Sequence, residues 1–305
     1  LCVEKSLSPS QCQPPSVLKS SMPTPTAILL ISCPDQRGIV ARLASFLFER
    51  GGNIVDSDQH SDLQAGRFLG RLEWELAGFQ LGKEDLRAAL AEIVGPMGGS
   101  WELHFSDEVP RIAIWCSRQE HCLLDLLWRG QAGELGGDLA LVLSNHDLLR
   151  HHVEPLGIPF HVLPVSPETK AAVEARELDL LRQERVELVV LAKYMQVLSP
   201  DFLRAFPNVI NIHHSFLPAF AGAQPYHQAH ARGVKLIGAT AHFVTEALDA
   251  GPIIEQDVVR VSHRDTVEDL VRKGKDMERL ALARAVRLHL QRRVLTCGNK
   301  TVVFE

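Results

Sequence analysis

The chain has 305 residues, 46% of them hydrophobic, and a formal net charge of −5 at pH 7. Domains typically contain ~100 to 200 residues, so two domains are expected rather than one. The acidic balance disfavours nucleic acid and anionic membranes as partners, because both attract a basic excess. No apolar run approaches the ~18 residues of a membrane helix. We therefore expect a soluble, cytoplasmic protein that acts on a small molecule.

The six cysteines give no sign of a metal site. They contain no Cys-x-x-Cys pair and no spacing suited to zinc, so we interpret them as free thiols of a reducing compartment. The paired histidines are also expected to hold no metal, because His213 and His214 should point to opposite faces of one strand.

Residues 1–22 are predicted to be a disordered N-terminal segment. They contain Ser, Pro, Gln and Lys but no apolar stretch, so a secretory signal is not expected. The first methionine, Met22, stands directly before the first predicted strand, which suggests upstream translated sequence or a tag before it. A weak similarity to organelle-targeting segments remains, against which Glu4 and the lack of arginine count.

Region 23–106 is predicted to form a ferredoxin-like domain. An unbroken apolar run at 27–33 has strand length, and the helix that follows it from Ile39 is ended by Gly51 and Gly52. A second amphipathic helix is predicted at 86–97, with further strands near 53–59, 67–76 and 101–105. The order βαββαβ is that of the ferredoxin-like topology. Gly70, inside the third strand, either weakens pairing or marks a close backbone approach.

The segment Cys-Pro-Asp-Gln-Arg-Gly-Ile-Val at 33–40, leading into the first helix, resembles an ACT domain. Such a resemblance implies a domain that binds amino acids and pairs with copies of itself. Two interpretations stay open: regulation by an amino-acid effector, or a spacer that drives formation of a homo-oligomer.

A polar linker that ends in proline, at 107–110, separates this domain from region 111–305. There, apolar strands at 111–116, 139–144, 160–164, 187–192, 208–213 and 235–244 alternate with helices at 121–129, 169–185 and 199–205. This alternation predicts an α/β fold with a Rossmann-like, mainly parallel sheet and an active site at the carboxyl ends of its strands. A long helix at about 266–293 is expected to begin with a capping box of Asp265 and Glu268, and 301–304 to add an edge strand.

The candidate catalytic groups lie between residues 208 and 256. Side chains alternate along a strand, so Asn211, His213 and Ser215 should share one side. Buried without partners, such groups cost roughly 1 to 3 kcal/mol each, which makes a substrate a candidate partner. A single buried Asn more often ties a strand end to a turn. His242 and Asp249 follow about thirty residues later, around a short turn.

The pattern Asn-x-His-x-Ser-x-Leu-Pro, followed by His-x-Val-x-x-x-x-Asp-x-Gly-Pro, resembles the signature of formyltransferases that use reduced folate. The matching residues are Asn211, His213, Ser215, Leu217, Pro218, His242, Val244, Asp249, Gly251 and Pro252. With an ACT-like domain in front, the layout resembles the formyltetrahydrofolate deformylase family, which hydrolyses 10-formyltetrahydrofolate to formate and tetrahydrofolate. The resemblance implies water as co-substrate, no cofactor and no metal, and a place in one-carbon metabolism and purine biosynthesis.

The resemblance also implies roles for individual residues. The residues expected to bind the folate are Met195, Gln196, Val197, Leu198, Gly222, Tyr226, Thr245 and Leu248. For Tyr226, packing on its own loop is an equal alternative. Asn211 and protonated His213 are expected to stabilise the formyl oxyanion. Asp249 is expected to deprotonate water after burial has raised its pKa, with His242 and Ser215 in support.

Two alternatives remain open. One is a formyltransferase that acts on a phosphorylated amine, such as glycinamide ribonucleotide, or on a transfer RNA. The other is a non-catalytic sensor of amino acids and folate. The turn 117–121 has no glycine, and its Glu120 would compete with a phosphate for the positive end of the next helix. Water is therefore the expected acceptor, and the acidic chain separately disfavours transfer RNA.

Overall fold

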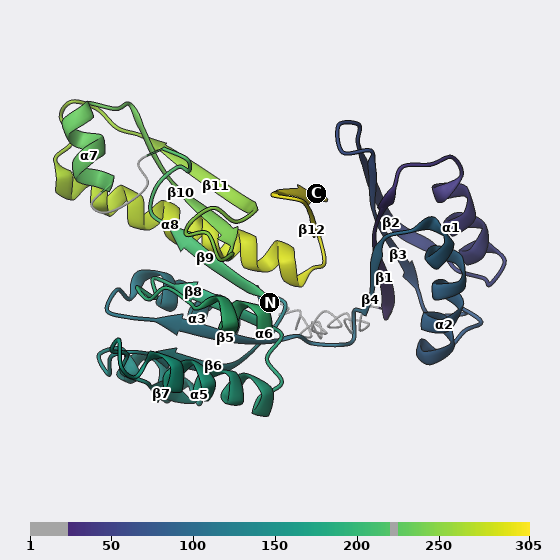
Figure 1. Ribbon diagram of the computed structural model, residues 1–305, viewed down its shortest axis with the longest axis horizontal. Coiled ribbons are helices and arrows are strands. Elements are labelled where there is room, and N and C mark those ends of the chain that lie inside the picture. The colour runs from purple at the N-terminus through teal and green to yellow at the C-terminus, as the bar shows by residue number, and fades with distance from the viewer. Residues whose placement is uncertain (1–23, 220–224) are drawn as a thin grey trace, which may run out of the picture.

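The computed structural model describes residues 24–219 and 225–305, which form two units, each built on its own sheet (Figure 1). The segment predicted to be disordered, 1–22, and the candidate Gly222 lie outside the described residues. In the part of the chain that is described, no helix is long and apolar enough to cross a membrane.

The first unit is a four-stranded antiparallel sheet in the order β2-β3-β1-β4. Its elements are β1 (Thr26–Pro34), α1 (Ile39–Phe48), β2 (Ile54–Asp62), β3 (Arg67–Glu75), α2 (Lys83–Val94), a 3-10 turn (Gly95–Met97) and β4 (Ser100–Phe105). Both helices pack on one face through Leu43, Phe46, Leu86 and Leu90. The predicted βαββαβ order is confirmed. A Cβ on Gly70 would lie 2.9 Å from the ring of Phe68, so this glycine allows close packing within the sheet.

The second unit is a seven-stranded sheet in the order β11-β10-β9-β8-β5-β6-β7. Its strands are β5 (Arg111–Cys116), β6 (Asp138–Ser144), β7 (Phe160–Val162), β8 (Leu188–Ala192), β9 (Val209–His213), β10 (Leu236–Phe243) and β11 (Ile253–Arg260). Strands β5 to β9 are parallel, whereas β10 is antiparallel to both of its neighbours, β9 and β11. The predicted mainly parallel sheet is thereby confirmed.

Helices cover both faces of this sheet, as buried parallel strands require. They are α3 (His121–Gln131), α4 (Arg150–Val153), a 3-10 turn (Glu154–Leu156), α5 (Lys170–Gln183), α6 (Pro200–Ala205), α7 (Pro225–Arg232) and α8 (Val267–Leu290). Helices α3 and α8 share one apolar core, and α5 and α6 share the core on the opposite face. The order of the strands reverses between β5 and β8, which is where ligands bind in open α/β sheets.

The start of α8 differs from the prediction. Thr266 is the N-cap residue: it accepts a hydrogen bond from the backbone N–H of Asp269, and the Asp269 carboxylate accepts one from the N–H of Thr266. Asp265 instead pairs with Lys273 and accepts a hydrogen bond from the backbone N–H of Ser262. The capping box therefore lies one residue later than predicted, because Asp265 is held by the preceding loop.

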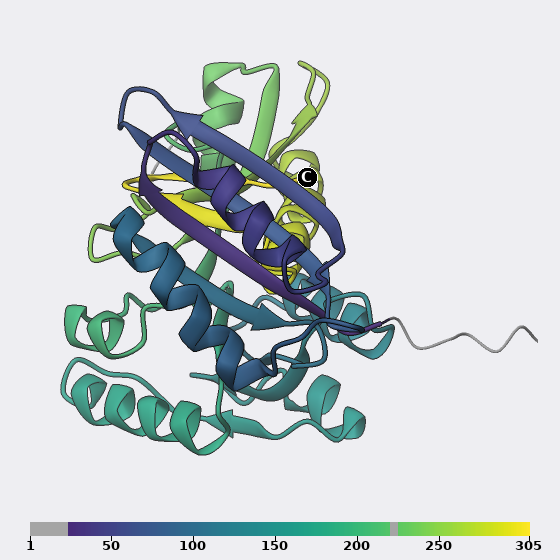
Figure 2. The same cartoon turned by 90° about the vertical axis from the view of Figure 1, so that its right-hand side faces the viewer.

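The chain after α8 joins the two units. It folds into a hairpin of β12 (Val294–Cys297) and β13 (Lys300–Val303), so the segment predicted as an edge strand pairs with its own neighbour. Phe304 is buried against Leu30 and Leu69 on the open face of the first sheet. Figure 2 shows this sheet lying across the hairpin.

An arginine of the first sheet makes the polar part of this junction. The buried Arg71 on β3 forms ion pairs with Asp56 and Glu73, both at 2.6 Å. Its Nε–H also donates to the carbonyl of Arg292, just beyond α8 (3.1 Å). A guanidinium next to the carbonyl end of a helix is favourable electrostatically.

Candidate active site

The candidate catalytic residues meet at a cavity of about 490 Å³ where β9 ends. The antiparallel strand β10 lies beside β9, so that His242 is opposite Asn211 and Thr240 is opposite His213. A mainly parallel sheet predicts that the strand at 235–244 ends at the same carboxyl edge as its neighbours. Because β10 runs in the opposite direction, His242 instead reaches the cavity from a strand that leads away from that edge.

Asp249 joins this group from the loop after β10. Its Oδ2 lies 3.1 Å from His213 Nδ1, and its Oδ1 lies 3.6 Å from His242 Nε2. The backbone of Asp249 has φ +53, in the left-handed region that non-glycine residues rarely adopt. Such a conformation costs of the order of 1 kcal/mol, and here it aims the carboxylate at both imidazoles.

The pKa of Asp249 is opposite in direction to our expectation. Hydrogen bonds from His213 first, and from His242 second, hold this pKa well below its usual range, despite the opposing effect of burial. The carboxylate is therefore ionised at neutral pH, and the prediction that burial raises its pKa was wrong.

The two ring nitrogens of His213 have different surroundings. Its Nδ1 faces Asp249, while its Nε2 is buried and has no hydrogen-bond partner among the described residues. A buried polar atom without a partner costs about 1 to 3 kcal/mol, so a ligand atom that bonded to Nε2 would remove this penalty.

His242 is held by hydrogen bonds on both ring nitrogens. Its Nδ1–H donates to the carbonyl of Phe243 (2.8 Å), and Asn211 Nδ2 donates to its Nε2 (3.3 Å). The same Nε2 also lies near the Asp249 carboxylate, so His242 contacts both polar neighbours of the cavity. His242 thus orients the Asn211 amide, a contact that sequence reasoning did not foresee.

Six of the eight candidate folate-binding residues line the same cavity, namely Met195, Gln196, Val197, Leu198, Thr245 and Leu248. Ser117 Oγ, at the end of β5, accepts a hydrogen bond from the backbone N–H of Met195 (3.2 Å), which fixes the segment after β8. The side chains of Met195, Val197 and Leu248 are largely exposed. They form an apolar rim at the entrance of the cavity.

Two candidates lie elsewhere. Tyr226 and Ser215 line a separate cavity of about 270 Å³. Tyr226 donates to Glu278 Oε1 (2.7 Å). Ser215 Oγ is buried without a partner in the described part of the chain, and it does not share the cavity of His213. The reason is that β9 ends at His213, and the alternation of a strand no longer holds two residues later.

Sequence reasoning missed a buried network beside the cavity. Lys193 Nζ lies 3.2 Å from Glu278 Oε2 and 3.1 Å from His214 Nδ1. The ring of His214 stacks on that of His213, with centroids 4.8 Å apart and planes 16° apart. The two histidines were expected on opposite faces, but the end of the strand lets their rings lie side by side. One sequence signal for this network was available: Lys193 directly follows the buried strand β8.

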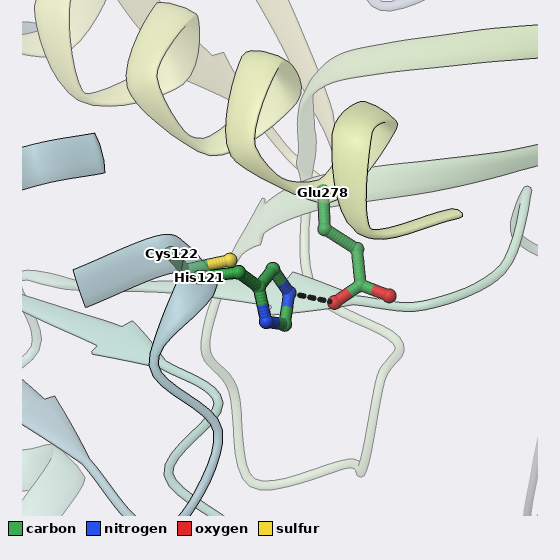
Figure 3. Close-up of side chains that lie close together, drawn as sticks. All are labelled: His121, Cys122 and Glu278. Carbon is green, nitrogen blue, oxygen red and sulfur yellow. Dashed lines mark hydrogen bonds and ion pairs between the residues drawn. The ribbon is translucent and has the colours of Figure 1, made fainter. Parts of the chain in front are cut away.

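Figure 3 shows the other side of this network, where Glu278 on α8 faces His121 and Cys122 at the start of α3. These side chains have the donor types of a metal site. Burial, however, raises the pKa of the Cys122 thiol, which keeps it protonated. Glu278 Oε2 is already paired with the Lys193 ammonium and with His121. We therefore interpret the cluster as an ion-pair network.

The two units and the site define an ACT domain joined to a formyltransferase domain. A family model for the ACT domain matches residues 27–95, and one for formyl transferases matches residues 110–286. The chain belongs to the formyltetrahydrofolate deformylase family, whose members are hydrolases. It is 58% identical to the formyltetrahydrofolate deformylase of Synechocystis, over 92% of this chain and 98% of that one.

Solved structures place the chain in the same family. The crystal structure of a formyltetrahydrofolate deformylase from Pseudomonas syringae has a TM-score of 0.90 at 48% identity, covering 92% of this chain and 95% of that one. Glycinamide ribonucleotide transformylase 1 from Symbiobacterium toebii has a TM-score of 0.62 at 33% identity. That enzyme matches 67% of this chain and 98% of its own length.

Proposed function

We propose that this chain hydrolyses 10-formyltetrahydrofolate to formate and tetrahydrofolate. The observation that carries the proposal is the Nε2 of His213, which has no partner among residues 24–219 and 225–305 and is held next to Asn211 and an ionised Asp249 at the end of β9. The names of the relatives support the reaction. The apolar rim of Met195, Val197 and Leu248 suits contact with the faces of a pterin ring.

The polar groups have separate roles in the proposed reaction. Water attacks the formyl carbon, and the carbonyl electron pair moves to the oxygen. Asn211 and protonated His213 donate hydrogen bonds to that oxyanion, each worth ~2.7 to 4 kcal/mol in comparable sites. Collapse of the intermediate breaks the bond to N10, which takes a proton derived from the water, and formate leaves.

Asp249 contributes as an anion. Because its pKa is lowered, it accepts a hydrogen bond from the attacking water and stabilises the positive charge of His213. A carboxylate with a low pKa is a weak base, so we assign it the orientation of the water and only a transient share of the proton.

The test is to supply purified protein with 10-formyltetrahydrofolate alone and to measure formate and tetrahydrofolate. Both should appear in equal amounts, at a rate that added glycinamide ribonucleotide does not change. Formylated ribonucleotide as the main product would establish the transferase alternative. Folate binding without turnover would establish the sensor alternative.

A further inference from the structure

Glu278 is a buried carboxylate to which three other elements contribute partners. It interacts with His121 Nε2 from α3 (2.8 Å), with the hydroxyl of Tyr226 from α7 (2.7 Å) and with Lys193 Nζ from the loop after β8 (3.2 Å). Burial alone would raise the pKa of Glu278, but the hydrogen bond from His121 and the charge of Lys193 outweigh it and lower the pKa to about 2. The group is therefore a permanent anion inside the second unit.

Lys193 is the cation that faces this anion. Its side chain is only 4% exposed, and its backbone has φ +63, which a lysine adopts at a cost of the order of 1 kcal/mol. From this position the ammonium also donates to His214 Nδ1. A ring that accepts at Nδ1 carries its single proton on Nε2, so Lys193 fixes the tautomer of His214.

His214 in turn stacks on His213, the candidate catalytic histidine. Burial first, and then the charges of Lys193 and His213, lower its pKa to about 4, so the ring is neutral at physiological pH. Its stacking on His213 brings the charges of the network close to that ring, where the low dielectric constant makes them effective. On its other side, His213 faces Asp249, and Asp249 faces His242.

We propose that Lys193 and Glu278 are positioning residues that keep His213 able to hold a proton. Lys193 holds His214 as a neutral, fixed ring, and Glu278 cancels the charge of Lys193 so that a second positive charge beside His213 is not penalised. The proposal rests on the proposed function, in which protonated His213 stabilises the oxyanion. In this proposal the buried Lys193–Glu278 ion pair affects catalysis without contacting the formyl group.

The first test is Glu278→Gln in the full chain. Glutamine has nearly the same shape and keeps one acceptor oxygen, for either His121 or Tyr226, but it leaves the Lys193 ammonium unbalanced. The added positive charge disfavours protonated His213, so the midpoint of its titration should move to lower pH by roughly 1 unit. The alkaline limb of kcat should move by the same amount, with KM for 10-formyltetrahydrofolate within about 2-fold of the wild-type value.

The titration is followed by NMR of ¹⁵N-histidine-labelled protein without substrate, so it remains decisive even if no formate is released. In that event the proposed function would fail while the role of Glu278 was still tested. Asp276→Asn is the matched control, because it removes an exposed carboxylate from the same helix. An unchanged His213 midpoint in Glu278→Gln would overturn the proposal.

The double variant Lys193→Met/Glu278→Gln removes both charges and tests the argument if the single variant does not fold. With no unbalanced charge left, His213 should titrate within about 0.3 pH units of the wild-type midpoint. Its kcat should still fall by at least ~10-fold, because nothing fixes the tautomer of His214. Wild-type kcat in a folded double variant would overturn the positioning role.

Discussion

Asp249 is positioned by an unusual backbone conformation and is ionised by its two histidine neighbours. We predict that Asp249→Asn keeps folate binding but lowers kcat by at least ~10²-fold, since the amide cannot balance the positive charge of His213. Steady-state kinetics, with folate binding measured by fluorescence, checks both parts. A folded variant with near-normal turnover would remove Asp249 from the mechanism.

Glu177, on α5, provides a pH-dependent contribution to stability. Burial raises its pKa to about 7, although Tyr194 donates a hydrogen bond to it (3.1 Å). A carboxyl group with a raised folded pKa binds its proton more tightly in the folded state. Its contribution is therefore fully present below the unfolded pKa and is lost as pH rises towards 7.

We accordingly predict that Glu177→Gln flattens the pH dependence of the free energy of unfolding. Between about pH 4.5 and 7 the wild-type protein should lose of the order of 1 to 3 kcal/mol through this group, and the variant should not. Urea unfolding at pH 5 and pH 8 measures the difference. Identical pH slopes for the two proteins would show that Glu177 titrates normally.

Helix α8 holds the site together because its single glycine, Gly274, makes room for α7. A Cβ on Gly274 would lie 2.0 Å from the hydroxyl oxygen of Tyr226, which bonds to Glu278 one turn further along α8. Glycine inside a helix costs about 1 kcal/mol relative to alanine, so the position sacrifices helix stability for this contact.

We predict that Gly274→Ala lowers both stability and kcat, despite the better helix propensity of alanine. The added methyl group displaces Tyr226 and leaves Glu278 with one donor fewer. In a double-mutant cycle, Gly274→Ala should cost much less in a Tyr226→Ala background, where the clash is absent. Equal costs in the two backgrounds would contradict this account. Thermal unfolding and formate release give the two measurements.

The elements and the principal candidate residues followed from local patterns, whereas the network did not. The spacing of Asn211, His213 and Asp249 is a sequence motif, and the apolar periods predicted both sheets. No periodicity in the sequence relates Lys193 to Glu278, or Tyr226 to Gly274. The members of each pair come into contact only after the sheet and α8 have packed. His214 was misplaced for a related reason: strand alternation holds only while the strand continues.

At the scale of the whole molecule, the hairpin after α8 joins the units through the buried Phe304. We predict that Phe304→Ala lowers the free energy of unfolding by about 3 kcal/mol or more, through the cavity left between Leu30 and Leu69. The change should loosen the first unit from the second. Calorimetry should then show two transitions in place of one.

Phe48→Ala is the control for this change, because the Phe48 side chain on α1 is largely exposed and its loss should cost little. An equal loss in the two variants would contradict the role of Phe304. A fragment without residues 27–106 would expose Phe304 and the carbonyl group that Arg71 satisfies.

The position of Phe304 also has a consequence during synthesis of the chain. Leu30 and Leu69 leave the ribosome long before Phe304, and translation at about 5 to 20 residues per second separates them by roughly 10 to 60 s. For that time the first unit has a sheet on whose open face Leu30 and Leu69 are not yet covered by Phe304. The nascent chain is therefore most exposed to aggregation and to chaperone binding on this face, until the hairpin emerges and covers it.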